Sequence, residues 1–260
     1  DEYLTKIAIP QVREVLTTIQ PDILWWDTPT WMTPERAKPL HDLIALRPGL
    51  ITNNRLGGGY QGDTETPEQH IPATGFKDRD WEVCMTMNDT WGFKSYDDNW
   101  KSTEDLIRKL CDIVSKGGNF LLNVGPTAEG EIPQPSIERL TQVGEWMKVN
   151  GEAIYGTQAS PFRNLPWGRC TRKSANGVTT LYLHVFDWPA DGRLVIPAMK
   201  NEAEKACLLA GGKELAVSRD GGDVVIAVPK EAPDRIASVV VLRVKGEVET
   251  APYVGMPEKD

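Results

Sequence analysis

The residues best suited to chemistry are polar side chains at the ends of short apolar segments. The segment 22–27 reads DILWWD and ends in Asp27, and the segment 50–55 reads LITNNR and ends in Arg55. A third apolar segment carries Glu82 at its second position. In parallel α/β folds, catalytic side chains lie where strands end and loops begin. Carboxylates with tryptophans beside them favour glycoside hydrolysis, which needs a carboxylate pair.

Each of these positions also has a purely structural interpretation. Asp27 fits a turn or a helix cap, and Glu65 and Glu68, in a loop before a proline, fit solvated surface positions. Alternation along the strand predicts that one indole of Trp25 and Trp26 faces the interior and the other faces the helices. The outward-facing indole would then serve core packing alone.

Other catalytic chemistries lack their motifs. No serine lies in a G-x-S-x-G elbow. The glycine run 57–59 is not followed by Lys and Ser or Thr, as a phosphate-binding loop requires. The histidines have no metal-ligand spacing, so we predict no metal site and no cofactor; they are His41, His70 and His184.

The composition limits the classes of partner. The chain has 29 Lys and Arg against 37 Asp and Glu, a formal net charge of −8. A chain this acidic lacks the basic surface that a nucleic acid or an anionic membrane attracts. No apolar run approaches the roughly 20 residues that cross a bilayer. We therefore predict neither a nucleic-acid nor a membrane partner, while four dispersed cysteines leave the redox compartment open.

The hydrophobic pattern changes its period along the chain. Up to residue 157, strands alternate with helices, which predicts a parallel sheet with helical crossovers. After it, short strands separated by turn residues predict an antiparallel β-sandwich over 158–260 with a polar tail, and a possible short helical turn near 201–205. The expected strands are 22–27, 50–55, 81–88, 119–125, 179–186, 193–196, 223–228 and 238–244, and the expected helices 3–19, 34–46, 102–116 and 135–150.

Several motifs occur in an order that resembles one enzyme family. The most specific are SKGGNFLLNVGP at 115–126 and GEAIYG at 151–156. DILWWD, TNNR, TPEQ, WE and TWG precede them. Together they resemble the α-L-fucosidases of glycoside hydrolase family 29. The resemblance covers about residues 1–157 and is weaker over the sandwich.

The resemblance implies roles for individual residues. Asp27 matches the family's catalytic nucleophile, and Glu68 best matches its general acid/base, with Glu82 as the alternative. Arg55 matches the arginine that contacts the nucleophile and the sugar. Trp25 matches a tryptophan that lines the sugar site. A guanidinium beside Asp27 favours its ionised form, and we expect Glu68 to lie away from that charge.

Fucose is a 6-deoxy sugar, so its methyl group needs an apolar surface, and Trp91 matches the family's aromatic residue there. The implied substrate is a fucosylated oligosaccharide or glycoconjugate, and the implied location is secreted or periplasmic. The implied mechanism retains the anomeric configuration. Two alternatives stay open: a non-catalytic carbohydrate-binding fragment, and a retaining glycosidase for another sugar.

The chain departs from the family in length. An eight-unit barrel takes about 250 residues, whereas four predicted strands precede the sandwich here. We therefore expect a partial TIM-type barrel of about four β/α units, truncated at its N-terminus. The missing upstream half is then an expected partner, and it would carry the family's sugar-binding histidines.

Overall fold

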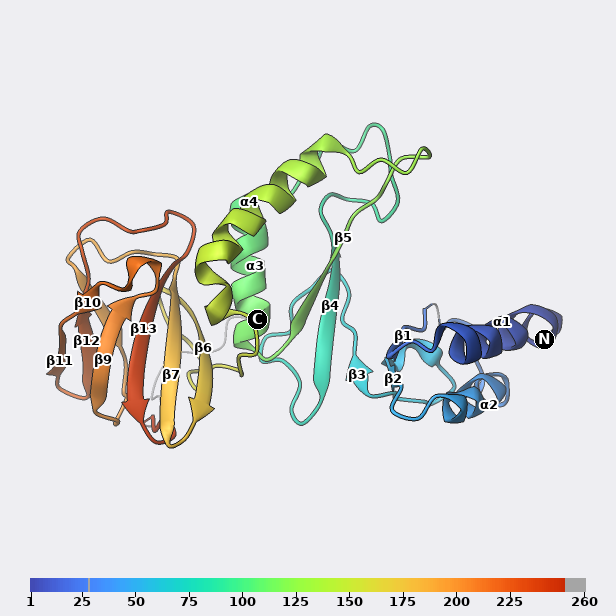
Figure 1. Ribbon diagram of the computed structural model, residues 1–260, viewed down its shortest axis with the longest axis horizontal. Helices are drawn as coiled ribbons and strands as arrows, with labels where there is room; N and C mark the ends of the chain where they lie inside the picture. Colours follow the sequence, from blue (N-terminus) through green and yellow to red (C-terminus); the bar gives the residue numbers. More distant parts are fainter. Residues whose placement is uncertain (28, 251–260) are drawn as a thin grey trace. The chain divides into compact units, whose positions relative to one another are not determined.

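The computed structural model describes residues 1–27 and 29–250 (Figure 1). The remaining residues of the predicted polar tail, 251–260, lie outside the described residues. The chain forms two compact units. The first contains residues 1–72 and 76–84, and the second contains 73–75 and the chain from 85 onward.

The first unit begins with helical backbone from Leu4 to Ile19. It consists of a π-helical segment η1 (Leu4–Ala8), the α-helix α1 (Ile9–Glu14) and a second π-helical segment η2 (Val15–Ile19). Pro10 lies inside this helical segment, where a proline removes one backbone hydrogen bond. The backbone stays helical on both sides of it, and Pro10 follows the point at which η1 passes into α1.

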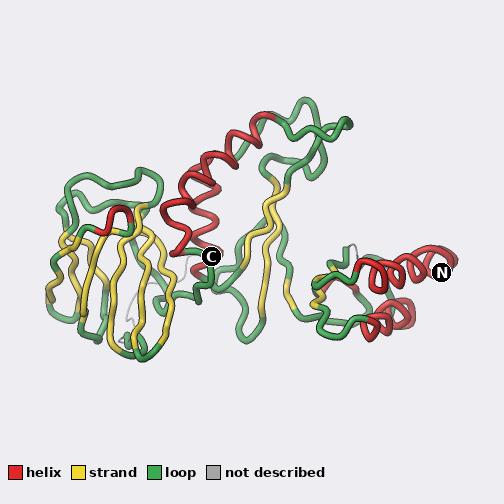
Figure 2. The backbone as a smooth tube through the Cα atoms, in the orientation of Figure 1, coloured by secondary structure: helices red, strands yellow, loops and turns green. Residues whose placement is uncertain are grey.

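The helix predicted over 34–46 begins where the sequence places it. Thr33 accepts a hydrogen bond from the backbone N–H of Arg36 at 3.4 Å, and Pro34 takes the first helical position of α2 (Pro34–Asp42). A 3₁₀ turn, η3 (Leu43–Leu46), completes the predicted length. Figure 2 shows these helices in red beside the short strands that they follow and precede.

Four parallel strand segments follow one another in the first unit. β1 (Ile23–Leu24) pairs with β2 (Ile51–Thr52), and a bridge from Asn53 to Thr64 leads to β3 (Thr64–Glu65). β3 pairs with β4 (Asp80–Thr86), which continues into the second unit. The sequence pattern missed β3, which lies in a polar stretch.

β3 depends on a glycine that no hydrophobic pattern marks. Gly62 has φ +57°, and a Cβ at this position would lie 2.2 Å from the carbonyl oxygen of Asn53. Only glycine allows the chain to pass the end of β2 at this distance. The close approach is what brings residues 64–65 beside the sheet.

The two faces of this sheet have different surroundings. Leu24 packs against Leu16, Leu43 and Leu50 on the side of the sheet that the helices cover. Trp26 packs in a second cluster with residues of α2. Ile23 and Ile51, directly paired across β1 and β2, are 60% and 42% exposed. The first unit therefore covers one face of β1 and β2 with helices and leaves an apolar pair open on the other.

The second unit joins two helices to two antiparallel sheets. Ser102 caps α3 (Thr103–Ser115) through the N–H of Asp105 at 3.0 Å, as predicted. β5 (Asn119–Asn123) and α4 (Gln134–Asn150) follow. The five-stranded sheet has the order β10-β9-β13-β7-β6, and the three-stranded sheet β11-β12-β8. Their bounds are β6 (Gly168–Ala175), β7 (Val178–Val185), β8 (Arg193–Ile196), β9 (Ala203–Leu208), β10 (Glu214–Leu215), β11 (Val217–Asp220), β12 (Asp223–Ala227) and β13 (Ser238–Lys245).

The sandwich strands that the sequence missed are β6, β9, β10 and β11. The short helical turn considered near 201–205 is wrong, because β9 begins at Ala203. β9 pairs along β13, and this pairing buries Ala206 and Leu208 in the core between the sheets. Long-range pairing thus overrides a polar local pattern.

Both helices of the second unit pack on the outer face of the five-stranded sheet. Ile107 and Cys111 of α3 and Trp146 of α4 form one buried cluster with Tyr182 and Val239. Consequently the two compact units do not coincide with the predicted domains 1–157 and 158–260. The pattern change near 157 marks the end of the helices, whereas packing joins those helices to the sandwich.

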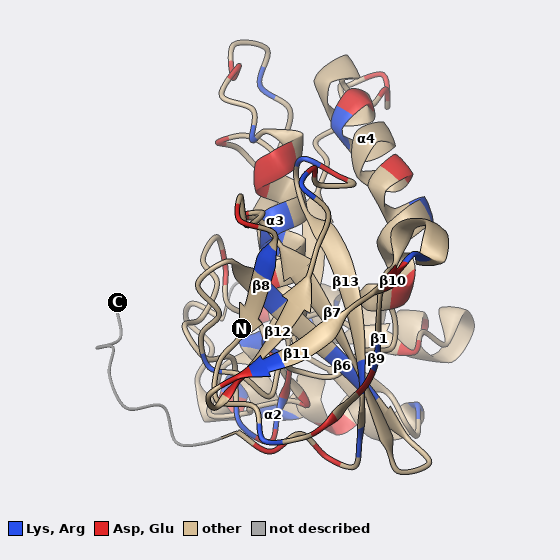
Figure 3. Cartoon of the chain, turned by 90° about the vertical axis from the view of Figure 1, so that its left-hand side faces the viewer, with Lys and Arg blue, Asp and Glu red and all other residues tan. Residues whose placement is uncertain are grey.

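Charged residues of both signs occur on the sandwich strands and on the loops that join them (Figure 3). One pair crosses the three-stranded sheet, where Arg193 of β8 lies 2.7 Å from Asp220 of β11. Both side chains are at least half exposed. Such exposed pairs contribute about 0–1 kcal/mol each, so the core between the sheets supplies most of the stability.

A fully buried histidine lies where α3 meets the sandwich. His184 Nε2 is 3.1 Å from the Thr171 hydroxyl, which donates to the carbonyl of Ala153, so Nε2 donates to Thr171. Nδ1 is 3.5 Å from the Cys111 sulfur. Burial raises the pKa of the Cys111 thiol, which therefore stays protonated and faces a neutral ring.

This histidine predicts a loss of stability in acid. Burial lowers the pKa of His184 from 6.5 to about 4. The contribution of the neutral ring to the free energy of unfolding is complete above pH 6.5, the pKa in the unfolded chain. It falls by about 3 kcal/mol as the pH drops from 6.5 to 4. Urea unfolding at pH 7 and pH 4.5 should show this loss, and His184→Gln should remove it. His70→Gln, at an exposed position, is the control, and an equal pH dependence in all three proteins would contradict the assignment.

Candidate active site

Three of the residues singled out in the sequence meet in the first unit. Arg55 Nη1 donates to Glu68 Oε2 at 2.8 Å and to Asp27 Oδ1 at 3.3 Å. The Arg55 side chain is 16% exposed, against 41% for Glu68 and 66% for Asp27. Two carboxylates from separate loops therefore share one largely buried guanidinium, and both remain accessible from solvent.

The position of Glu68 corrects one expectation. The sequence predicted that Glu68 lies away from the positive charge, and this is wrong, because Glu68 is nearer to Arg55 than Asp27 is. A parallel bridge between Glu68 and Cys84 explains the difference. The backbone N–H of Cys84 donates to Pro67, which fixes the Glu68 loop against β4.

The electrostatics keep Arg55 charged. Burial is the largest single influence and by itself lowers the pKa of Arg55, but the hydrogen bond and charge of Glu68, together with Cys84 and Asp27, outweigh it and raise the pKa. Burial likewise raises the pKa of the Cys84 thiol, against the opposing charge of Arg55. Cys84 therefore faces the guanidinium as a neutral thiol.

Their shared contact with Arg55 Nη1 sets an upper limit on the distance between the two carboxylates. Both oxygens contact Nη1, so they lie no farther apart than the two contact distances laid end to end, about 6 Å. Retaining glycosidases place their carboxyl groups about 5–5.5 Å apart, and inverting ones about 6.5–9.5 Å. The arrangement fits the retaining spacing.

Trp25 and Glu82 form a second pair beside this group. The Arg55 guanidinium lies 4.6 Å from the centre of the Trp25 ring, and Trp25 Nε1 donates to Glu82 Oε1 at 2.8 Å. Trp26 packs toward the helices instead, as the alternation predicted. Glu82 therefore orients the indole, whereas Glu68 shares a nitrogen with Asp27, which favours Glu68 over Glu82 as the second catalytic carboxylate.

Sequence reasoning missed the residues behind Arg55. Thr66, in the turn after β3, accepts from Arg55 Nε through its hydroxyl at 2.9 Å and from Nη2 through its carbonyl at 3.0 Å. Asn54 was noted only as a strand-end residue, and it accepts from the Thr66 hydroxyl at 2.7 Å. The signal available was Gly62, which places β3 beside β2.

Trp91 belongs to the second unit. It lies on the loop after β4, is 39% exposed, and its carbonyl accepts a hydrogen bond from Asn123 at 2.7 Å. A Cβ on Gly125 would lie 3.0 Å from that carbonyl oxygen, so glycine lets the two loops pack. The loop is thus held through the carbonyl of Trp91 by the side-chain amide of Asn123, and the role of Trp91 toward the sugar methyl group stays a prediction.

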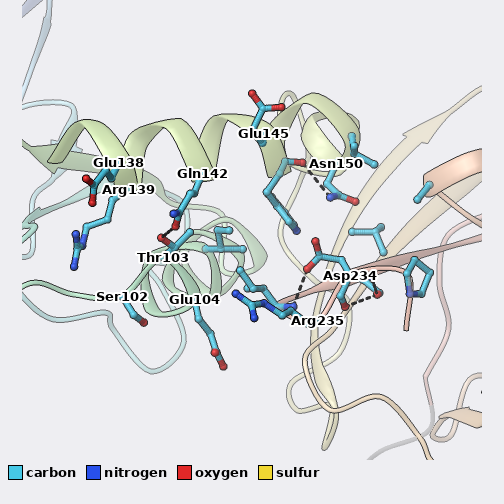
Figure 4. A pocket seen from close by; sticks show the side chains of 18 residues that line it. Ser102, Thr103, Glu104, Glu138, Arg139, Gln142, Glu145, Asn150, Asp234 and Arg235 are labelled. Carbon is cyan, nitrogen blue, oxygen red and sulfur yellow. Dashed lines mark hydrogen bonds between the residues drawn. The ribbon is translucent and has the colours of Figure 1, made fainter. Parts of the chain in front are cut away.

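A groove of about 800 Å³ lies between α3, α4 and the loop before β13 (Figure 4). Some of its polar side chains are already bonded: the Thr103 side chain contacts Gln142, and the Asp234 carboxylate accepts from the backbone N–H groups of Ile236 and Ala237. Trp146 is 5% exposed and offers no ring face for a sugar. The groove is a packing seam between helices and sheet.

Two features are absent from the part of the chain that the structure describes. In residues 1–27 and 29–250, no cluster of His, Cys, Asp and Glu side chains is arranged to hold a metal ion. Across the same part of the chain, no helix has the length and apolar character to cross a membrane.

Comparison with known proteins gives one consistent result. The sequence model of the family described as Alpha-L-fucosidase matches residues 1–152. An α-L-fucosidase of Dictyostelium discoideum is 30% identical over 231 residues, covering 83% of this chain and 50% of that protein. The chain spans about half the length of the curated relatives it matches.

Solved structures agree with the sequence match. α-L-Fucosidase isoenzyme 1 from Paenibacillus thiaminolyticus superposes with a TM-score of 0.82 at 33% identity, covering 94% of this chain and 62% of that one. A family 29 α-L-fucosidase from Bacteroides thetaiotaomicron, trapped as a covalent intermediate with 2-fluoro-fucosyl fluoride through a Glu-to-Gln variant, has a TM-score of 0.79 at 28% identity. It covers 91% of this chain and 60% of that one.

Proposed function

Because this chain belongs to the α-L-fucosidase family of glycoside hydrolases, we propose that it carries the two catalytic carboxylates of a retaining α-L-fucosidase. The observation that supports this most directly is the single Arg55 nitrogen shared by Asp27 and Glu68. The rest of a (β/α) barrel completes the catalytic domain in this proposal. The relatives are about twice as long as the chain, which is consistent with a catalytic domain that contains further β/α units.

In the first step, the Asp27 carboxylate attacks the anomeric carbon of the fucosyl group. The bond between that carbon and the glycosidic oxygen breaks, and the oxygen takes the proton of the Glu68 carboxylic acid. The product is a fucosyl ester of Asp27, a free alcohol and an ionised Glu68. The hydrogen bond from Arg55 Nη1 positions the Asp27 carboxylate before the attack.

In the second step, the Glu68 carboxylate takes a proton from water as the water oxygen attacks the anomeric carbon. The ester bond to Asp27 breaks, which returns Asp27 to its ionised form and Glu68 to its protonated form. Two inversions give fucose with the original anomeric configuration. Trp25, held by Glu82, lines the sugar site, and Trp91 supplies the apolar surface for the methyl group.

The proposed substrate is a terminal α-L-fucosyl group on an oligosaccharide or glycoconjugate. Matched relatives include proteins described as plasma α-L-fucosidases from rat and human. For this protein we propose a secreted or periplasmic location. A panel of nitrophenyl glycosides measures the sugar preference: turnover of the α-L-fucoside alone supports the proposal, turnover of another glycoside would replace it, and sugar binding without any turnover would indicate a binding module.

The assignment of the acid/base is tested by removing each candidate in turn. Glu68→Ala should lower turnover of substrates with poor leaving groups by about 10²–10⁴-fold, and far less for activated aryl fucosides, because these need no proton. Added azide should rescue the activated substrates by forming fucosyl azide of retained configuration. Glu82→Ala is the matched control. If Glu82→Ala shows azide rescue and Glu68→Ala does not, Glu82 holds the role.

A further inference from the structure

All five N–H bonds of the Arg55 guanidinium have an acceptor. Nε donates to the Thr66 hydroxyl at 2.9 Å, and Nη2 donates to the Thr66 carbonyl at 3.0 Å and to the Cys84 sulfur at 3.5 Å. The two N–H bonds of Nη1 go to Glu68 and Asp27. Three donors thus hold the group from behind, and one nitrogen faces both carboxylates.

Thr66 is itself fixed in both of its hydrogen-bonding roles. It is 7% exposed, and its hydroxyl accepts from Arg55 while donating to Asn54 Oδ1 at 2.7 Å. The Asn54 amide in turn donates to Glu65 at 2.6 Å, and Glu65 lies 2.7 Å from Arg79. These contacts fix the orientation of the Thr66 hydroxyl. Because the hydroxyl accepts from Arg55 Nε, they also fix the plane of the Arg55 guanidinium.

The proposed reaction moves one negative charge between the two carboxylates. Before the first step Asp27 is ionised and Glu68 carries a proton. In the covalent intermediate Asp27 is a neutral ester and Glu68 is ionised. Each state contains one carboxylate, and the distances of 3.3 and 2.8 Å place both within reach of the same nitrogen without movement of the guanidinium.

We propose that Thr66 is a positioning residue that holds Arg55 where Nη1 serves Asp27 in the first chemical step and Glu68 in the second. The inference rests on the proposed function. Arg55 is then a counter-ion for whichever carboxylate is charged, and it needs no rearrangement between the steps, which is the condition for effective electrostatic stabilisation. Without the hydroxyl, the guanidinium can turn toward one carboxylate only or away from both.

The test compares Thr66→Val with Thr66→Ser in the protein with its complete catalytic domain. Valine keeps the shape and removes the hydroxyl, and serine keeps the hydroxyl. Thr66→Val should lower kcat/KM for a nitrophenyl α-L-fucoside, which reports the first step, by about 10- to 100-fold. It should also lower kcat for a dinitrophenyl fucoside, whose second step limits turnover, by a similar factor. Thr66→Ser should stay within about threefold of the parent on both.

Labelling of the active molecules separates positioning from a loss of folded protein. The labelled fraction after complete reaction with 2-fluoro-fucosyl fluoride counts the active molecules in each protein. Thr66→Val should keep the labelled fraction of the parent and lower kcat per labelled molecule, and Thr66→Ser should restore that kcat. A smaller amount of active enzyme would lower the labelled fraction instead.

The outcomes distinguish the two proposals. An inactive parent protein would overturn the proposed function itself. An active parent with Thr66→Val unchanged in kcat per labelled molecule would overturn the positioning role, and so would a fall confined to kcat/KM, which would show that Arg55 serves Asp27 alone. If Thr66→Val fails to fold, Thr66→Ala supplies the same comparison against Thr66→Ser.

Discussion

Asp27→Asn should abolish turnover of aryl α-L-fucosides, lowering kcat by about 10⁴-fold or more. The amide has the size of the carboxylate and can still accept a hydrogen bond from Arg55, so the fold should be preserved. It cannot form the ester intermediate, because an amide oxygen is a weak nucleophile and carries no charge to balance the developing oxocarbenium ion. The measurement is steady-state hydrolysis by the protein with its complete catalytic domain.

Asp22→Asn is the matched control. Asp22 precedes β1 as Asp27 follows it, and it also pairs with an arginine, Arg47, at 2.9 Å, with its side chain 91% exposed. Its replacement should leave kcat unchanged. Mass analysis after treatment with 2-fluoro-fucosyl fluoride should find the sugar on the peptide that contains Asp27. A label on another peptide, or an Asp27→Asn protein within tenfold of the parent, would contradict the assignment of the nucleophile.

Residues 1–260 expressed alone should be inactive and should associate. Ile23 and Ile51 form a directly paired, exposed apolar patch on the sheet face that the helices of the first unit leave open. In the proposed barrel, the remaining β/α units cover this face. Leaving a few hundred Å² of apolar surface in water forfeits several kcal/mol, at about 25 cal/mol per Å². This is comparable with the roughly 5–15 kcal/mol net stability of a domain.

Light scattering and size-exclusion chromatography measure the association, and aryl α-L-fucoside hydrolysis measures the activity. Ile23→Thr combined with Ile51→Thr keeps β-branched side chains and reduces the apolar surface, so it should lower association without restoring activity. Leu24→Thr, on the helix-covered face, should not lower association. A monomeric, active 1–260 chain would show that these residues form a complete site.

The sandwich gives a related comparison. The residues that form the core between its two sheets all lie within residues 162–248, and we expect the sandwich to fold better than the first unit. However, the outer face of its five-stranded sheet buries Tyr182 and Val239 against α3 and α4. The helices that precede the predicted boundary at 157 are therefore part of what stabilises it.

The features that the amino-acid sequence predicted well are those that depend on neighbouring residues. Thr33 and Ser102 start helices through hydrogen bonds within one turn, so their positions follow from residue type. The motifs at 115–126 and 151–156 indicated the family, and the ends of the first two apolar segments supplied Asp27 and Arg55. These signals need no information from distant parts of the chain.

The assembly of the candidate site depends on contacts that form when the chain folds. β3 has two residues and exists because Gly62 lets the chain pass the end of β2, and this contact brings Thr66 behind Arg55. The bridge from Glu68 to Cys84 placed Glu68 on the guanidinium that the sequence assigned to Asp27 alone. Such placements depend on pairing between residues far apart in sequence, whose energy no local pattern records. For that reason the sequence resemblance predicted the two carboxylates, and the fold determined that both contact one guanidinium.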